Sequence, residues 1–126
     1  MKKMIFSISL LVLFVLASYL WESNIYEKME DIKNLAGIAI EAIEAKETEN
    51  AQKIIAQLES LWTKSFLEWT STINHTALDE VTKNIERAQI YLQRGDATHA
   101  SVELAAIRQM LQVMMDANDY HLGNLF

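Results

Sequence analysis

Residues 51 to 75 carry the most regular hydrophobic pattern in the chain. Side chains recur there at steps of three and four, which places them on one stripe of a helix about 100° wide. Trp62 and Trp69 lie two turns apart on this stripe with Phe66 between them, so we expect other helices to cover it as the centre of the core. The stripe consists of Ala51, Ile54, Ile55, Leu58, Leu61, Trp62, Ser65, Phe66, Trp69 and Ile73.

Three further helices are predicted by the same criterion. Before the aromatic helix, a heptad-like seam indicates a first helix. After it, one helix is expected to begin at the capping-box sequence Thr76 to Asp79 and to end before Gly95, and the next is expected to be capped by Asp96 or Thr98. Thr48 is the expected cap of the aromatic helix. The three apolar sets are Ile25, Met29, Ile32, Ala36, Ala39 and Ile43; Leu78, Val81, Ile85, Ala88 and Leu92; and Ala100, Leu104, Ile107, Leu111 and Met114.

The two halves of the chain have the same pattern when residue numbers are shifted by 49. The shift places Met29, Ile32, Ala36, Ala39 and Ile43 on Leu78, Val81, Ile85, Ala88 and Leu92 without a gap. The match continues through the connection, where Ala51, Ile55, Leu58 and Trp62 fall on Ala100, Leu104, Ile107 and Leu111. Each half is therefore predicted to be one helical hairpin of a common design. Two such hairpins either close into a four-helix bundle or stack as in solenoid repeats, and the presence of only two units favours the bundle.

The N-terminus contains an uncharged run of eighteen residues, Met4 to Trp21, preceded by Lys2 and Lys3. At 1.5 Å per residue this run is about 27 Å long, close to the thickness of a bilayer's hydrocarbon core. It is interpreted either as a signal peptide cut before Ser18 or as a retained single-pass anchor. The aromatic residues at its end, typical of a membrane interface, favour the anchor. Residues 22 onward would then lie outside the cytoplasm.

The expected fold class is thus all-α, an N-terminal transmembrane helix followed by a four-helix bundle. The expected divisions are a membrane anchor at residues 1–21, an extracytoplasmic helical domain at 22–118 and a tail at 119–126. The tail contains Tyr120, Leu122, Leu125 and Phe126, too many apolar side chains for a solvated end, so it is expected to dock on the bundle through a turn at Gly123 and Asn124. Alternatively, it is a peptide offered to a partner.

Composition supports long helices and excludes several kinds of chemistry. The 126 residues include no proline, three glycines and no cysteine, which removes disulfides, thiolate nucleophiles and cysteine-based metal sites from consideration. The net charge of −6 argues against nucleic acid as a partner. No Gly-rich phosphate loop or nucleophile elbow occurs, so no cofactor and no catalytic residue is predicted.

The three histidines, at 75, 99 and 121, do not form a known metal-binding pattern. None lies four residues from another on one helix, and the nearest approach to a ligand pair is Asp96 with His99, at a predicted helix start where a cap and an exposed polar side chain are expected anyway. No metal site is predicted. His75 is singled out because it follows the aromatic helix directly; it either bonds backbone groups at a helix end or gates a ligand site.

These landmarks, in order, resemble a family of proteins. They are a short basic start, one apolar span, Trp62, Trp69, His75, the helix start at Leu78-Asp79-Glu80 and the terminal Asn124-Leu125-Phe126. The chain resembles the bacterial membrane-anchored family catalogued as domain of unknown function four-three-six-three. The resemblance implies a membrane helix and an extracytoplasmic helical domain, and it implies no activity, substrate or cofactor.

Two functions fit this picture. The first is a non-catalytic membrane-anchored module that binds another protein or stabilises a membrane complex. The second is a sensor or carrier for a small ligand or lipid, with a pocket near the tryptophan helix. Candidate contact residues for a ligand or partner are Trp62, Phe66, Trp69, His75, Asn124 and Phe126.

Overall fold

The fold consists of four α-helices, as seen in a computed structural model that describes residues 2–70 and 73–125, with the side chains of 3, 6, 18–24 and 118–125 left out. In chain order these helices are α1 (Lys2–Glu44), α2 (Thr48–Trp69), α3 (His75–Gln93) and α4 (Ala97–Leu125). The described part contains no strand. The all-α prediction is therefore confirmed.

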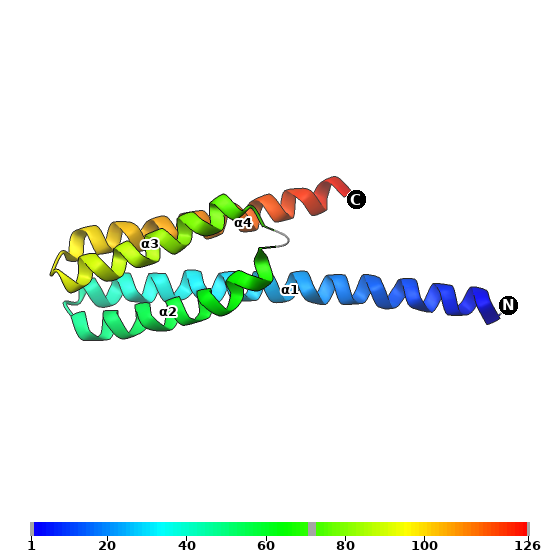
Figure 1. Cartoon of the computed structure of the whole chain (residues 1–126), viewed down its shortest axis with the longest axis horizontal. Coiled ribbons are helices and arrows are strands. Elements are labelled where there is room, and N and C mark those ends of the chain that lie inside the picture. Colours follow the sequence, from blue (N-terminus) through cyan, green and yellow to red (C-terminus); the bar gives the residue numbers. More distant parts are fainter. Residues whose placement is uncertain (1, 71–72, 126) are drawn as a thin grey trace.

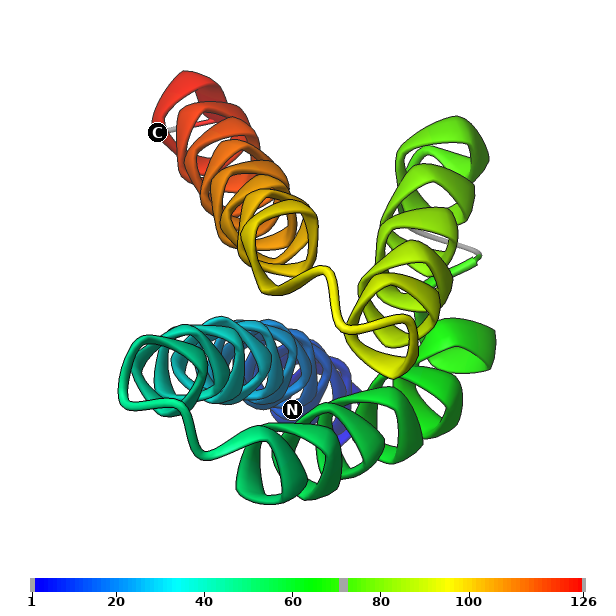
Figure 2. The same cartoon turned by 90° about the vertical axis from the view of Figure 1, so that its left-hand side faces the viewer.

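The helices form a closed bundle of two antiparallel hairpins (Figure 1). The first hairpin is α1 and α2, and the second is α3 and α4. Each helix packs on two others, because α1 also contacts α4 and α2 also contacts α3. Figure 2 looks along the bundle from the end that carries the two hairpin turns. The structure is a four-helix bundle rather than a stack of solenoid repeats, as the sequence analysis favours.

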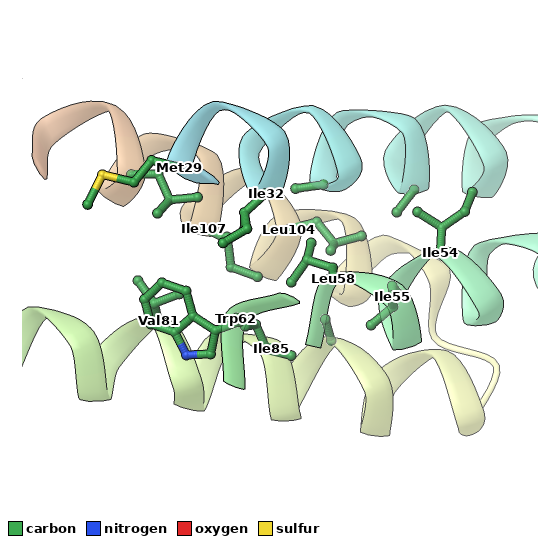
Figure 3. Packing of buried hydrophobic residues seen from close by; sticks show 14 of the residues in the cluster. Met29, Ile32, Ile54, Ile55, Leu58, Trp62, Val81, Ile85, Leu104 and Ile107 are labelled. Atoms are coloured by element: carbon green, nitrogen blue, oxygen red, sulfur yellow. The ribbon is translucent and has the colours of Figure 1, made fainter. Parts of the chain in front are cut away.

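One continuous core lies between the four helices (Figure 3). Most of its members are side chains that the periodicity places on the inner stripe of each helix, Ala42 is an additional one, and none of them carries a charge. Five residues expected on these stripes are only partly buried: Ile43, Leu61, Phe66, Ile73 and Met114. The buried apolar residues are Ile25, Met29, Ile32, Ala36, Ala39, Ala42, Ala51, Ile54, Ile55, Leu58, Trp62, Trp69, Leu78, Val81, Ile85, Ala88, Leu92, Ala100, Leu104, Ile107 and Leu111.

The structure confirms the internal duplication. A shift of 49 residues moves the end of α1 onto the end of α3 and the start of α2 onto the start of α4. Equivalent core positions are buried in both hairpins: Leu58 and Ile107, for example, are both fully inaccessible. The hairpins thus share the helix boundaries at their turns and most core positions as well as a sequence pattern.

The two hairpin turns are also the same. In the first, Lys46 has a positive φ of 62°, and in the second the equivalent Gly95 has a φ of 78°. The Lys46 and Glu47 amides donate to the carbonyls of Ile43 and Ala42, and equivalent bonds form one repeat later. Both turns are Schellman motifs, in which one residue must adopt the left-handed conformation.

Lys46 is the less suitable residue for that conformation, because a side chain with a Cβ atom raises its energy by about 1 to 2 kcal/mol. We therefore expect Lys46→Gly to raise the free energy of unfolding by about 0.5 to 1 kcal/mol. The reciprocal change, Gly95→Lys, is the matched control and should destabilise, although no heavy atom lies within 4 Å of a Cβ built there. Urea denaturation of both variants measures the effect, and equal shifts of the same sign would contradict it.

Two of the predicted helix starts are wrong by a few residues. Thr48 is the first residue of α2, and the N-cap is Glu47, whose side chain makes no cap hydrogen bond. The cap of α3 is Asn74, whose side chain accepts from the Thr76 amide at 2.9 Å. The helix α3 begins before the expected threonine because Asn74 itself is a favourable N-cap residue and satisfies the Thr76 amide. Asp96 does cap α4, accepting from the His99 amide at 3.1 Å.

The prediction of an N-terminal transmembrane helix is wrong. Within the part of the chain that the structure describes, no helix combines the length and the apolar character that crossing a membrane requires. The helix α1 continues into the bundle as an amphipathic helix. The single-pass topology and the placement of residues 22–118 outside the cytoplasm were both inferred from the transmembrane helix, so the structure supports neither of them.

The C-terminal segment differs from its expectation at the backbone. The helix α4 continues to Leu125, beyond Asp116, where the hydrophobic period ends, and through the glycine and asparagine expected to form a turn. The side chains of Tyr120, Leu122, Asn124 and Leu125, and all of Phe126, lie outside the described residues. Docking of the tail side chains therefore stays a prediction.

Candidate functional site

Four of the predicted contact residues come together at one end of the bundle. Trp62 and Trp69 pack edge to face, with ring centroids 5.5 Å apart. Phe66 lies 6.3 Å from Trp62 and 6.0 Å from His75, measured between ring centroids. The helical spacing of α2 places the first three on one side, and the start of α3 brings His75 to them. Trp62, Phe66, Trp69 and His75 therefore form one aromatic cluster.

Both indoles belong to the core. Trp62 is 2% exposed and Trp69 is fully inaccessible. The ring nitrogen of Trp62 donates to the hydroxyl oxygen of Thr82 at 2.9 Å, and that hydroxyl donates to the Leu78 carbonyl at 3.1 Å. Burial of an indole requires such a partner. Trp62 links α2 to α3, and both indoles present almost no surface to a ligand.

His75 stands at the edge of this cluster. It is the first residue of α3 rather than part of a connection, and its side chain is exposed. Its Nδ1 atom lies 3.7 Å from a carboxylate oxygen of Asp79, one helical turn later. This arrangement resembles an ordinary exposed pair at i and i+4, worth only a few tenths of a kcal/mol. His75 therefore contributes a partly exposed ring face and no second reactive group.

A polar cluster lies at the opposite end, in the turn between α3 and α4. His99 Nδ1 is 2.7 Å from a carboxylate oxygen of Asp96, and the His99 ring stacks on Tyr91 with centroids 5.1 Å apart. The side-chain and backbone hydrogen bonds from His99 lower the pKa of Asp96 below its usual 3.8. In the part of the chain that the structure describes, no group of three or more potential metal ligands forms. The cluster caps α4.

This cap predicts a dependence of stability on acid. Because the pKa of Asp96 is lower in the folded state than in the unfolded chain, its contribution is present above about pH 4 and is lost as the pH falls through the folded pKa. We expect Asp96→Asn to flatten the acid limb of the stability curve measured by urea denaturation between pH 5 and 2. Glu47→Gln, at the equivalent position of the first turn, should change the curve less, and an equal change would contradict this role of Asp96.

A surface hollow of about 420 Å³ lies between α2 and α3, on the hairpin-turn side of the aromatic cluster. Ile55 and Leu92 form its floor and Ala56 one wall. Its remaining lining consists of Gln52, Gln89 and Gln93. These side chains carry no charge and no nucleophile, so the hollow offers contacts but no chemistry. The hollow could not be predicted from the sequence, because the hydrophobic pattern of one helix does not determine its distance from another.

Among the residues whose side chains the structure describes, the largest exposed apolar surface is the N-terminal part of α1. In Figure 1 this part extends past the ends of the other helices. Ten large apolar side chains between Met4 and Leu16 are each 52–72% exposed. They occupy every side of the helix rather than one stripe. We refer to residues 4–17 as the apolar arm.

Comparison with known proteins identifies the family of this chain. No curated protein and no solved structure matches it. Residues 19–125 match the family described as Domain of unknown function (DUF4363), which covers α2, α3, α4 and the bundled part of α1. Since the match includes most of the sequence, the chain belongs to the DUF4363 family.

Proposed function

We propose that this protein is a non-catalytic helical module that binds another protein through the apolar arm. The observation that carries the proposal is the exposure of ten large apolar side chains on a helix outside the bundle. Exposed apolar patches on soluble domains rarely exceed a few hundred Å² unless they bind something. The bundle itself offers no comparable surface among the described residues, because its other exposed large apolar side chains are scattered singly.

The distribution of the arm residues limits the kind of partner. An amphipathic helix covers one stripe, whereas a helix that is apolar on all sides needs to be surrounded. A flat partner surface would leave the far side of the arm in water. We therefore expect a partner with an apolar groove or with several helices that enclose the arm, and the overall net charge of −6 makes nucleic acid unsuitable.

Site-specific photo-crosslinking tests the proposal in cells that make the full chain. A photoreactive residue at Leu10 should give a discrete protein adduct, and one at Lys64 or Arg87, exposed on the bundle, should not. The captured protein, once identified and purified, should bind the full chain in solution. Absence of any protein adduct from the arm would overturn the proposal.

Charged substitutions in the arm provide the quantitative form of this test. Leu11→Glu and Leu13→Glu, at side chains 66% and 69% exposed, should weaken binding of the purified partner by at least about tenfold, because each buries a carboxylate in an apolar site. Their melting temperatures should equal that of the unchanged protein, since neither side chain contacts the core. Leu67→Glu, exposed on α2, is the matched control and should leave binding unchanged.

A further inference from the structure

The duplication makes two of the helix interfaces equivalent. The shift of 49 residues maps α1 onto α3 and α2 onto α4, so the contact of α1 with α4 corresponds to the contact of α3 with α2. Both interfaces join one hairpin to the other. Each is therefore an internal reference for the other, and the structure shows that they are not alike: α1 and α4 pack extensively, while α2 and α3 make the least extensive contact of the bundle.

Close approach and polar links hold α1 against α4. The guanidinium of Arg108 lies over Gly37, 3.6 Å from the position that a Cβ atom would take there. Lys33 Nζ donates to the Gln112 side-chain oxygen at 2.6 Å. The Tyr26 hydroxyl donates to the Met115 carbonyl at 2.9 Å. These three contacts join residues 26–37 of α1 to residues 108–115 of α4, in the half of the interface away from the hairpin turns.

The interface of α2 and α3 is wider for identifiable reasons. Trp62 occupies the position that Leu111 has on α4, and helix separation follows the size of the side chains at the contact. The positions equivalent to Gly37 and Arg108 are Glu86 and Glu59, two acidic residues in place of a glycine and a cation. The links across this interface include the Trp62–Thr82 hydrogen bond, the Phe66–His75 ring contact and an exposed hydrogen bond from Gln89 to Glu59.

The space between α2 and α3 is left unfilled where the side chains are short. At Trp62 the indole occupies the space between the helices and donates to Thr82 of α3. Towards the hairpin turns, Ala56 cannot fill this space, and the hollow of about 420 Å³ opens over Ile55 and Leu92. Both floor residues are nonetheless at most 4% exposed. One end of this interface is closed by aromatic packing, and the other is covered only by glutamine side chains.

We propose that the bundle opens reversibly between α2 and α3, beginning at the end near the hairpin turns, while α1 and α4 stay together. This goes beyond the proposed function and does not depend on the arm. Opening exposes the apolar floor formed by Ile55 and Leu92 without global unfolding, because the aromatic cluster at the other end acts as the closed side. Local openings of this kind require less free energy than unfolding of the whole domain.

Single cysteines in the full chain test the proposal, since the natural sequence contains none. Ile55→Cys places a thiol at the floor of the hollow, and Leu104→Cys places one at the equivalent position of α4, equally far from its hairpin turn. Both native side chains are buried. Each labelling rate with a thiol reagent is compared with the global unfolding of the same variant. The Ile55→Cys thiol should react at least about tenfold faster on this scale, and labelling of both thiols only through global unfolding would overturn the proposal.

Filling the hollow is the second arm of the test. Ala56→Leu, added to the Ile55→Cys variant, should slow labelling by at least about threefold, because the larger side chain occupies the gap. Ala105→Leu, at the equivalent exposed position of α4, should leave the rate unchanged. If Ile55→Cys fails to fold, amide exchange in the unchanged protein gives the answer: residues 52–59 should exchange faster than residues 101–108, and equal protection would contradict the opening.

Discussion

An unfolding free energy lower by about 3 to 5 kcal/mol is the result that we expect for Trp69→Ala. The indole is fully inaccessible and packs edge to face on Trp62, with interplanar angle 71°. Its removal loses both the transfer free energy of a large side chain and the contacts of the residues around the cavity. Domains of this size are stable by about 5 to 15 kcal/mol in total, so the variant should retain little folded population at elevated temperature. Chemical denaturation monitored by circular dichroism measures the change.

Two further variants interpret that result. Leu67→Ala, two residues away and 79% exposed, should change stability by less than about 0.5 kcal/mol. Trp62→Phe keeps most of the ring packing and removes the donor to Thr82, so a loss near 1 kcal/mol is expected from the hydrogen bond. A Trp69→Ala variant as stable as the unchanged protein would show that the aromatic stripe does not form the core, and would return the indoles to consideration as a ligand site.

The bundle could be predicted because the hydrophobic spacing within each helix is enough to identify its buried face. The spacing of Ile32, Ala36 and Ala39 is enough to identify the inner side of α1, and the equivalent spacing identifies that of α3. With no proline and few glycines to interrupt them, four such stripes have few ways to share one core. Turn chemistry was visible at Gly95, whereas its partner Lys46 became recognisable only through the shared geometry of the two turns.

Features that depend on neighbouring helices could not be predicted in the same way. The stripe shows that Trp62 faces inward, but the acceptor that satisfies its ring nitrogen is Thr82, on another helix, and Thr82 stands beside the apolar set of α3 rather than in it. Asn84 is similarly buried against Met110 without any signal in its own segment. The aromatic cluster and its burial could be predicted from the sequence, but the side chains of other helices that contact it could not.

The N-terminal segment shows a different limit. An uncharged run predicts that its side chains are shielded from water, but it does not indicate what shields them. Here the part of the run with described side chains, within residues 4–17, is exposed on α1, which continues into the bundle, and the described residues contain no helix suited to crossing a membrane. The exposure of this segment is a property of the folded molecule, because only the positions of α2, α3 and α4 show where the bundle ends.

The equivalent core positions Leu58 and Ile107 supply the second large effect. Both side chains are fully inaccessible, one in each hairpin. Truncation of a buried leucine or isoleucine to alanine typically costs about 2 to 5 kcal/mol. We expect Leu58→Ala and Ile107→Ala to fall in this range and to differ from each other by less than about 1.5 kcal/mol, because the two sites have the same place in the repeat.

The shape of the unfolding transition distinguishes a shared core from two independent hairpins. Since both side chains belong to one continuous cluster, each variant should melt in a single transition in which far-ultraviolet circular dichroism and tryptophan fluorescence coincide. Ile107→Ala is the more informative of the two, because Trp62 and Trp69 lie on the other hairpin. If that variant lost half of its helical signal while its tryptophan emission stayed native, the hairpins would be separate folding units, and the common core would not be what holds them together.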